Sequence, residues 1–443
     1  MYSNKRFSVG HALAHANAYK SKGFSPLSIT QYLVQLVFTH FSMHRDALSG
    51  EKSVIDGSSD AIYRFLKSSY INLTIFLFLV SSRVCIWVND LTSDKRITAL
   101  ILDDTLYHRP FSKKLELVSR VFDHTDHKYK RGFRSLFLGW SDGSTFLPLA
   151  FRHMSSTNKM NRFCECRDHT DNRTCGGKAK KEATMKSPDV ALRMLRDAKK
   201  HGIPAKHVLF DSWFTHPSFV INIHDIGFHS IGRLKNSKTR YWIGEDTFTL
   251  NQLYNRSKKR RGRSKYLLSI VVKIKNSDGN SLDARIVYVR DRANKKNWIA
   301  FLCTDMELTE EQIVELYGKR WSIEVFFKTC KSYLKFTGEF QQLSYESITA
   351  HTSIVAIRYM IFAIEQRQNI DLRRTPGDLF FLFAEEAKDI TFFEVISILM
   401  DKLTELISDI TTLNDREVEK MVDEFIQSLP FRIKGLMPRQ HVS

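Results

Sequence analysis

Two short apolar segments of the chain each end in aspartate, and this pattern constrains the fold more than any other feature. Residues 97–102 (Ile-Thr-Ala-Leu-Ile-Leu) lead into Asp103-Asp104-Thr105, and residues 207–210 (His-Val-Leu-Phe) lead into Asp211. Runs of this kind are typical of strands buried on both faces, which lie at the centre of an α/β sheet. We therefore expect two central strands whose acids emerge at the rim of one sheet.

The segments around these two strands predict a mixed sheet with helices on its faces. Asp142-Gly143 stands between two apolar runs and indicates a β-hairpin. Thr309 and Gln312 form a capping-box pattern that begins a long helix. Further strands are expected at residues 136–140, 146–151, 228–232, 285–289 and 298–303, and helices at residues 187–201 and 309–333.

Composition divides the chain into four regions. Residues 1–92 are predicted to be helical, and residues 93–235 with 284–340 form the α/β core. Residues 236–283 are basic, turn-rich and β-rich, which indicates an insertion into that core, and residues 341–443 are predicted to be helical. Lysine and arginine number 67 against 48 acidic residues, a net charge of +19, and the last region is acidic. A surface for an acidic partner such as nucleic acid is therefore expected mainly before residue 340.

The apolar run at residues 71–80 is the chain's best candidate for a membrane segment. It is shorter than the ~20 residues that a spanning helix needs, so a buried core helix is the better prediction. The N-terminus has no apolar segment typical of a secretory signal, and six cysteines in 443 residues do not indicate a disulfide scaffold. We expect no membrane partner and a cytoplasmic location.

Four polar residues share one face of the expected helix at 309–333. At ~100° per residue, Tyr317, Arg320, Glu324 and Lys331 fall within about a 60° arc, and Lys328 lies close to the same stripe. One interpretation is a solvated helix face with a Glu324–Lys328 ion pair. The other is a carboxylate ligand for a metal ion, flanked by groups that bind phosphate.

The spacing Tyr-x2-Arg-x3-Glu-x6-Lys resembles the signature of the IS-four family of bacterial insertion-sequence transposases. The likeness extends over roughly residues 95–340 and includes Asp-Asp-Thr after one strand, Asp-Ser-Trp-Phe after another, and a β-rich insertion. It implies a ribonuclease-H-like core with the metal-binding, catalytic acids Asp103, Asp211 and Glu324. Asp104 remains an alternative to Asp103, because strand alternation lets only one of the two face the metals.

The resemblance also implies a reaction and its partners. A transposase of this kind cuts double-stranded DNA at the element's inverted-repeat ends and joins the freed 3′-hydroxyl to target DNA. Carboxylate ligands suit Mg²⁺ or Mn²⁺, and two ions are expected. Tyr317, Arg320 and Lys331 would contact DNA phosphates, and a homodimer would hold two ends together. By analogy, residues 1–92 would bind the DNA ends and residues 341–443 would dimerise, in a bacterial protein acting at the nucleoid.

A basic cluster in the insertion is the second candidate for DNA contact. A loop that carries so many cations is typical of phosphate binding, with plain solvation as the alternative. Two other functions stay open at this point: a catalytically silent DNA-binding protein descended from a transposase, and a protein that uses its charge on a membrane surface. The cations proposed to bind DNA here and on the signature helix are Lys258, Lys259, Arg260, Arg261, Arg263 and Lys328.

Overall fold

The structure is a computed structural model of the 443-residue chain, and it divides into two compact units. Unit 1 comprises residues Met1–Val34 and Ser42–Arg373, and unit 2 comprises Gln35–Phe41 and Arg374–Ser443. Each unit is described by itself. The residues that the structure describes are 7–20, 22–39, 43, 59–93, 96–123, 126–167, 171–260, 264–291, 294, 297–338, 342–368 and 374–386.

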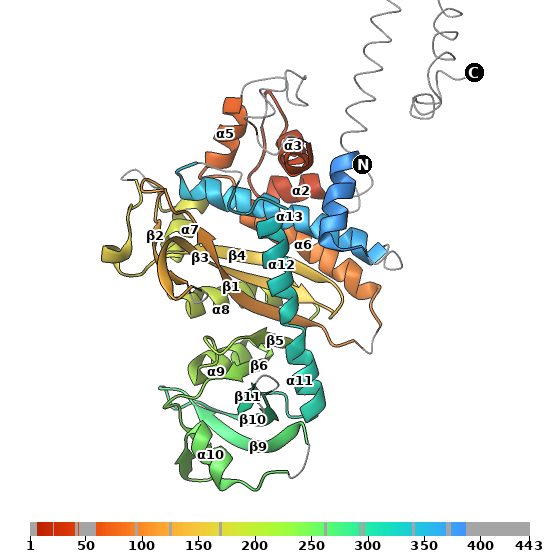
Figure 1. The fold of residues 1–443 in the computed structure, drawn as a ribbon. Coiled ribbons are helices and arrows are strands. Elements are labelled where there is room, and N and C mark those ends of the chain that lie inside the picture. The colour runs from red at the N-terminus through yellow and green to blue at the C-terminus, as the bar shows by residue number, and fades with distance from the viewer. Residues whose placement is uncertain are drawn as a thin grey trace, which may run out of the picture. The chain divides into compact units, whose positions relative to one another are not determined.

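Unit 1 is built on one mixed sheet of eleven strands, whose order is β2-β3-β1-β5-β6-β11-β10-β9-β7-β8, with β4 paired to β3 (Figure 1). The strands are β1 (Ala99–His108), β2 (Ser119–Asp123), β3 (Lys128–Ser141), β4 (Phe146–Met154), β5 (His207–Phe210), β6 (His229–Leu234), β7 (Tyr241–Ile243), β8 (Asp246–Phe248), β9 (Tyr266–Lys275), β10 (Ser281–Arg290) and β11 (Trp298–Cys303).

Five strands form the core, in the order β4-β3-β1-β5-β6. The first three are antiparallel neighbours, and β5 and β6 then run parallel to β1. This combination of an antiparallel meander with parallel crossover strands is the ribonuclease-H-like arrangement, so the predicted α/β fold class is confirmed. The Asp142-Gly143 hairpin between β3 and β4 is also confirmed, and Gly143 has the positive φ (94°) that such a tight turn favours.

Helices cover the sheet and form most of the N-terminal part of unit 1. In the described chain they are α2 (Val9–His15), α3 (Pro26–Thr39, which continues into unit 2), α5 (Ser59–Lys67), α6 (Leu73–Asp90), α7 (Cys175–Ala183), α8 (Ser187–Lys200), α9 (Pro217–Ile226), α10 (Leu250–Arg256), α11 (Glu310–Gly318), α12 (Trp321–Ser332) and α13 (Tyr345–Gln368).

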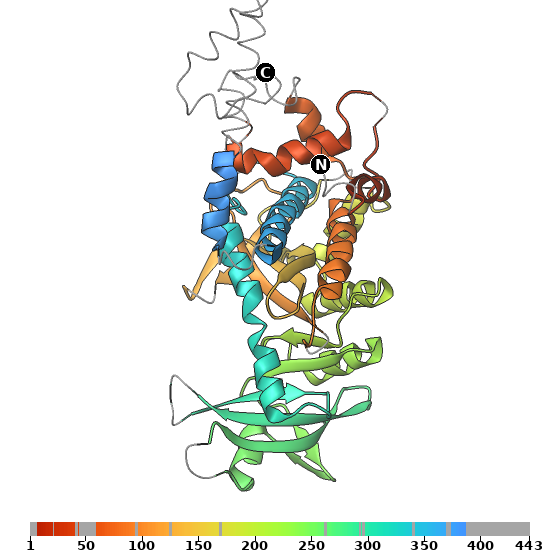
Figure 2. The ribbon, with the colours of Figure 1, turned by 90° about the vertical axis from the view of Figure 1, so that its right-hand side faces the viewer.

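Two of these helices, α6 and α13, are long and apolar enough to cross a membrane by length and composition. Both are nevertheless packed into the protein, with 56% and 78% of their most apolar stretches buried. They contact one another, and α6 also packs on β4 (Figure 2). The apolar run at residues 71–80 thus belongs to a helix of the core, as predicted.

Strand β1 continues past the point where the sequence predicted its end. The parallel pairing with β5 stops at Leu102 opposite Phe210, whereas the antiparallel pairing with β3 persists to His108. Residues 103–108 are therefore paired with a neighbouring strand on one side only. Asp103 lies within the strand rather than after it, at the point where its neighbour on the other side has ended.

The single helix expected over residues 309–333 is in fact two helices, and that prediction was wrong. α11 ends at Gly318, a residue that weakens helices, and α12 starts at Trp321. The Lys319 ammonium donates to the carbonyl oxygen of Ile97 at 2.8 Å, which fixes the joint beside the start of β1. Figure 2 shows the two helices running end to end. Tyr317 and Glu324 thus lie on different helices, and the arc computed for one helix does not apply to them.

The basic insertion shares the sheet of the core. β6 pairs with β11, β11 with β10 and β10 with β9, all antiparallel. The predicted boundary at residue 283 falls inside β10. Because the hydrogen-bond ladder is continuous, the insertion is joined to the core by a sheet rather than by a flexible linker.

In unit 2 most of the described residues are helical. Residues 376–386 form a helix, which Thr375 begins by exchanging hydrogen bonds with Asp378. Phe38 packs its ring against Phe380 and Phe383, with centroids 5.8 Å apart in both pairs.

Candidate active site

The ends of the β1–β5 ladder bring two predicted acids to neighbouring positions. Leu102 and Phe210 are the last paired residues, so Asp103 and Asp211 each follow a paired residue on adjacent parallel strands. Such strands lie about 4.8 Å apart. The negative charge of Asp211 is near enough to raise the pKa of Asp103.

The third predicted acid, Glu324, is linked to Asp103 by the side chain of Arg320. Nη1 of Arg320 contacts Oδ2 of Asp103 at 2.5 Å, and Nη2 contacts Oε1 of Glu324 at 3.0 Å. The Arg320 and Asp103 side chains are only 15% and 14% exposed. One guanidinium therefore bridges a strand acid and a helix acid that are 221 residues apart in the chain, since 324 − 103 = 221.

Asp104, the alternative first acid, points to the other face of the sheet. Its Oδ1 accepts from Nη1 of Arg134 at 2.6 Å, and Arg134 lies on the same face of β3. The Asp103 face is covered by α12, because Phe326 and Phe327 pack on Phe137, the residue opposite Asp103. Of the two adjacent aspartates, Asp103 is thus the one that shares the Arg320 guanidinium with Glu324.

Burial and charge make Asp103 unusually basic for a carboxyl group. Burial is the largest cause, Arg320 opposes it, and the charges of Asp104 and Asp211 add to it, so the pKa rises from 3.8 to about 7. With this pKa, the negative charge of the ionised Asp103 carboxylate is poorly compensated by the surrounding protein groups alone. A divalent cation would compensate it better than one guanidinium does.

The donor set of Asp103, Asp211 and Glu324 fits Mg²⁺ or Mn²⁺, because these hard ions prefer carboxylate oxygens. Among the residues that the structure describes, no three His, Cys, Asp or Glu side chains stand arranged around a common ion position. The arginine bridge accounts for this, because Arg320 lies between two of the three carboxylates. Ligation would require Arg320 to move out.

The remaining signature residues surround the bridge. The Tyr317 ring lies 4.6 Å from that of Phe301, and burial raises the pKa of its phenol. Nζ of Lys331 donates to Oγ1 of Thr105 at 2.7 Å, two residues along β1 from Asp103. Lys328 is exposed on α12. The structure thus brings Asp103, Arg320, Glu324 and Lys331 to one region, and the joint between α11 and α12 sets how that region is built.

The basic cluster of the insertion is only partly available for DNA. Arg260 makes two hydrogen bonds to Glu310, at 2.6 and 2.7 Å, and Lys259 lies over the Tyr254 ring at 4.7 Å. Lys258 is exposed. Arg261 and Arg263 lie outside the described residues.

Two tryptophans beside the acids were not singled out from the sequence. Trp213, two residues after Asp211, is 61% exposed, and Trp321, next to Arg320, is 64% exposed. Large exposed rings commonly mark contact surfaces. Their adjacency in the chain to a candidate acid and to the signature was the signal that could have identified them.

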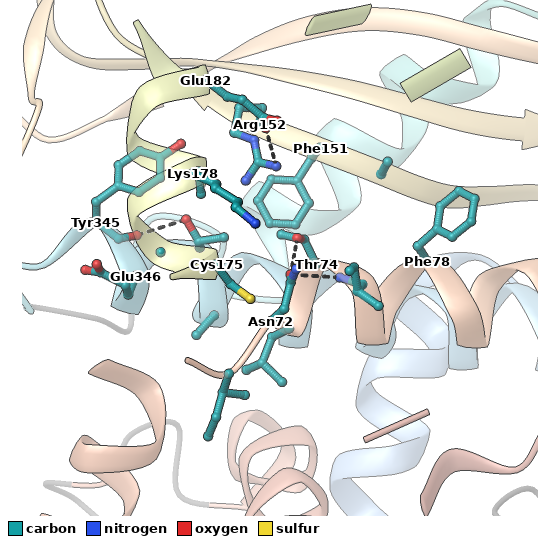
Figure 3. Close-up of a pocket in the computed structure, with 18 of the residues that line it drawn as sticks. Asn72, Thr74, Phe78, Phe151, Arg152, Cys175, Lys178, Glu182, Tyr345 and Glu346 are labelled. Atoms are coloured by element: carbon teal, nitrogen blue, oxygen red, sulfur yellow. Dashed lines mark hydrogen bonds and ion pairs between the residues drawn. The ribbon is translucent and has the colours of Figure 1, made fainter. Parts of the chain in front are cut away.

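A separate pocket of about 430 Å³ lies elsewhere in unit 1, between α6, α7, α8, α13 and β4 (Figure 3). Both apolar and polar side chains line its walls, and Arg152 and Glu182 form an ion pair of 2.7 Å within it. None of Asp103, Asp211 and Glu324 lines this pocket.

The comparisons with known proteins agree with this geometry. No curated protein matches the chain. The family model of the DDE superfamily endonucleases matches residues 43–296, which is more than half of the 443 residues and includes Asp103 and Asp211. The acids at the β1–β5 edge, the ribonuclease-H-like strand order and this match agree: the chain belongs to the DDE superfamily of endonucleases.

Proposed function

We propose that this endonuclease is the DNA transposase of a bacterial insertion sequence, of the IS-four family. It would cut DNA strands at the ends of the element and transfer them into target DNA by a cut-and-paste route. The observation that carries the proposal is the shared guanidinium between Asp103 and Glu324, with Asp211 on the adjacent strand end. The Tyr-x2-Arg-x3-Glu-x6-Lys spacing of residues 317–331 supports the assignment to the IS-four family.

In this proposal the three acids hold the metals and the signature cations hold DNA. Asp103, Asp211 and Glu324 would bind two Mg²⁺ or Mn²⁺ ions, which activate the attacking oxygen and stabilise the leaving oxygen when bound. Lys331 and Arg320 would neutralise the phosphates on either side of the cut. The guanidinium can bind a phosphate through two parallel hydrogen bonds.

Arg320 would exchange partners during the reaction. Without metal it neutralises Asp103 and Glu324 at 2.5 and 3.0 Å. When a DNA phosphate arrives, the guanidinium can turn to it and leave both carboxylates to the metal ions. Binding of DNA and binding of metal would then favour one another.

The wider setting of the reaction follows from the same family assignment. We propose double-stranded DNA, both inverted-repeat ends and target, as the substrate, and a homodimer in the DNA complex. The helical region before residue 93 would bind the ends, and the region after residue 340 would dimerise. The protein would act in the bacterial cytoplasm, at the nucleoid.

Donor cleavage tests the proposal directly. The DNA would carry the natural flanks of the reading frame, with Mg²⁺, and wild type would be compared with Glu324→Gln. Loss of one metal ligand should lower cleavage about 10³-fold, since such contacts contribute several kcal/mol. Glu311→Gln, an exposed carboxylate on α11, is the matched control and should cut normally. DNA binding without metal-dependent cleavage by wild type would instead favour a catalytically silent DNA-binding protein.

A further inference from the structure

The hairpin formed by β2 and the start of β3 extends the sheet beyond the catalytic core. β1 pairs with β3 only as far as Gly132, and β4 only as far as Arg134. Residues 128–130 of β3 are therefore paired with β2 alone, while the carbonyl oxygen of Arg131 also accepts from the backbone N–H of Arg109 at 2.9 Å. This end of the sheet, here called the distal hairpin (residues 119–123 and 128–131), lies beside the core strands (Figure 1).

Two arginines stand directly opposite one another on the distal hairpin. Arg120 pairs in register with Arg131, so both side chains lie on one face. Like charges in this position repel and destabilise a hairpin. Within the described chain neither guanidinium has a carboxylate partner. An uncompensated pair of this kind is unfavourable for folding and is best explained by an anionic partner.

Aromatic rings, and for Arg131 also the carbonyl oxygen of Pro110 at 3.0 Å, hold these guanidinium groups in place of acids. The Arg120 guanidinium lies over the Tyr129 ring at 4.4 Å, and that of Arg131 lies over the Phe163 ring at 4.3 Å. Tyr129 is 61% exposed and Phe163 is 47% exposed. Stacking orders an arginine without neutralising it, so the charge stays available to a ligand.

The acids of the distal hairpin lie on the opposite face. Asp123 pairs with Lys130 at 2.7 Å, and Asp126 contacts the same ammonium. Alternation along β3 and β2 puts Lys130 and Asp123 on one side and both arginines on the other. The arginine face is therefore positive, while the other face is close to neutral.

The arginine face is also the face of the catalytic acid. Along β3, Arg131 alternates in phase with Phe137, which lies opposite Asp103. Six residues of β3 separate the two positions, and the strand bends between them, because Nη2 of Arg134 donates to the carbonyl oxygen of Phe122 at 2.6 Å although Phe122 pairs with Tyr129. The bend brings the distal hairpin close to β1, since the same guanidinium also contacts Asp104 at 2.6 Å.

We infer that Arg120 and Arg131 of the distal hairpin bind the phosphate backbone of the duplex that flanks the scissile phosphate. This inference rests on the proposed function, because it takes the DNA position from the catalytic acids. The hairpin would set the line of the duplex across the sheet, while the acids act on the strand. Contacts to phosphate carry no sequence information, so this surface would bind any flank of the element.

Salt dependence of DNA binding measures the number of phosphate contacts. The protein would carry Glu324→Gln to prevent cleavage, and a 40-base-pair duplex ending the element would be titrated at 50 to 200 mM salt. Removing both arginines (Arg120→Gln with Arg131→Gln) should lower the slope of log affinity against log salt by about 2. The variant would therefore lose about tenfold less affinity than the parent over this salt range.

Two further variants separate charge from folding. Arg196→Gln with Lys200→Gln removes two exposed cations from α8, on the other side of the sheet, and should leave the slope unchanged. That side is identified by Trp140, whose indole donates to Pro204 just after α8 at 2.8 Å. Arg120→Lys keeps the charge and should keep the slope.

An equal slope for the distal-hairpin variant and its parent would overturn the inference while leaving the transposase proposal intact. The same reduction with the α8 variant would also overturn it, because the effect would then come from net charge. Failure of wild type to bind DNA, or to cut it with Mg²⁺, would overturn the proposed function instead.

Discussion

Replacing Asp103 with asparagine should stabilise the metal-free protein, although it should abolish catalysis. Burial and nearby charges raise the pKa of Asp103 from 3.8 to about 7. A raised pKa means that the unfolded chain holds this proton less tightly than the folded protein. The contribution of Asp103 to the free energy of unfolding is then most favourable at low pH, and this stability is lost as the pH rises from about 4 through 7.

The size of the effect follows from these two pKa values. With 3.8 for the unfolded chain and about 7 for the folded protein, ionising Asp103 costs about 1.7 kcal/mol at pH 5 and about 4 kcal/mol at pH 8. Asparagine carries no charge and escapes both costs. The stabilisation by Asp103→Asn should therefore grow by roughly 2.5 kcal/mol between pH 5 and pH 8.

Urea unfolding of the metal-free protein, followed by tryptophan fluorescence with EDTA at both pH values, would measure this difference. Asp104→Asn is the matched control, because it removes the neighbouring carboxylate of the same strand, which pairs with Arg134 at 2.6 Å on the other face of the sheet. Its loss should destabilise the protein by about 1.5–3 kcal/mol at pH 8, the opposite sign. If Asp103→Asn were destabilising at pH 8, or if its effect were the same at both pH values, the reasoning about this site would be refuted.

Three further predictions concern the metals and the core. Arg320→Ala should tighten Mn²⁺ binding about tenfold without DNA, because a competing cation is removed; an unchanged affinity by electron paramagnetic resonance titration would contradict the exchange. Since the metal needs ionised Asp103, its affinity should rise about tenfold per pH unit up to about pH 7 and then level off, with proton release measurable by calorimetry in two buffers. Lys180→Met should destabilise unit 1 by about 3–5 kcal/mol in thermal unfolding, because it leaves Glu116 and Glu346 buried without the cation that each contacts, at 2.9 and 2.8 Å; a loss below 1 kcal/mol would argue against this core ion cluster.

Local sequence patterns predicted those parts of the fold that depend on local physics. The short strand before Asp211 and the turn at Asp142-Gly143 follow from apolar runs and turn chemistry. The length of β1 could not be predicted in the same way. Residues 103–108 remain a strand because β3 is long enough to pair with them.

The candidate site could be predicted as a set of residues but not as an arrangement. Whether Asp103 or Asp104 faces Glu324 depends on which side of β1 is covered by α12, and no local pattern contains that information. The same holds for Arg260, whose partner Glu310 is 50 residues away. The break after Gly318 is held by the hydrogen bond from the Lys319 ammonium to the carbonyl oxygen of Ile97, which joins residues 222 positions apart in the chain.

The joint between α11 and α12 gives the signature an unusual sensitivity to insertions and deletions. α11 packs on β6 and β11, whereas α12 packs on β1, β4 and α13, so two different surfaces set the rotation of the two helices. One extra residue at the joint would rotate the residues of α12 by about 100° about the helix axis relative to α11, if both helix axes stayed in place. Glu324 would then leave Asp103 while every signature residue was still present. Among related sequences, the number of residues between Tyr317 and Glu324 should therefore be invariant, even where the loops of the insertion differ in length.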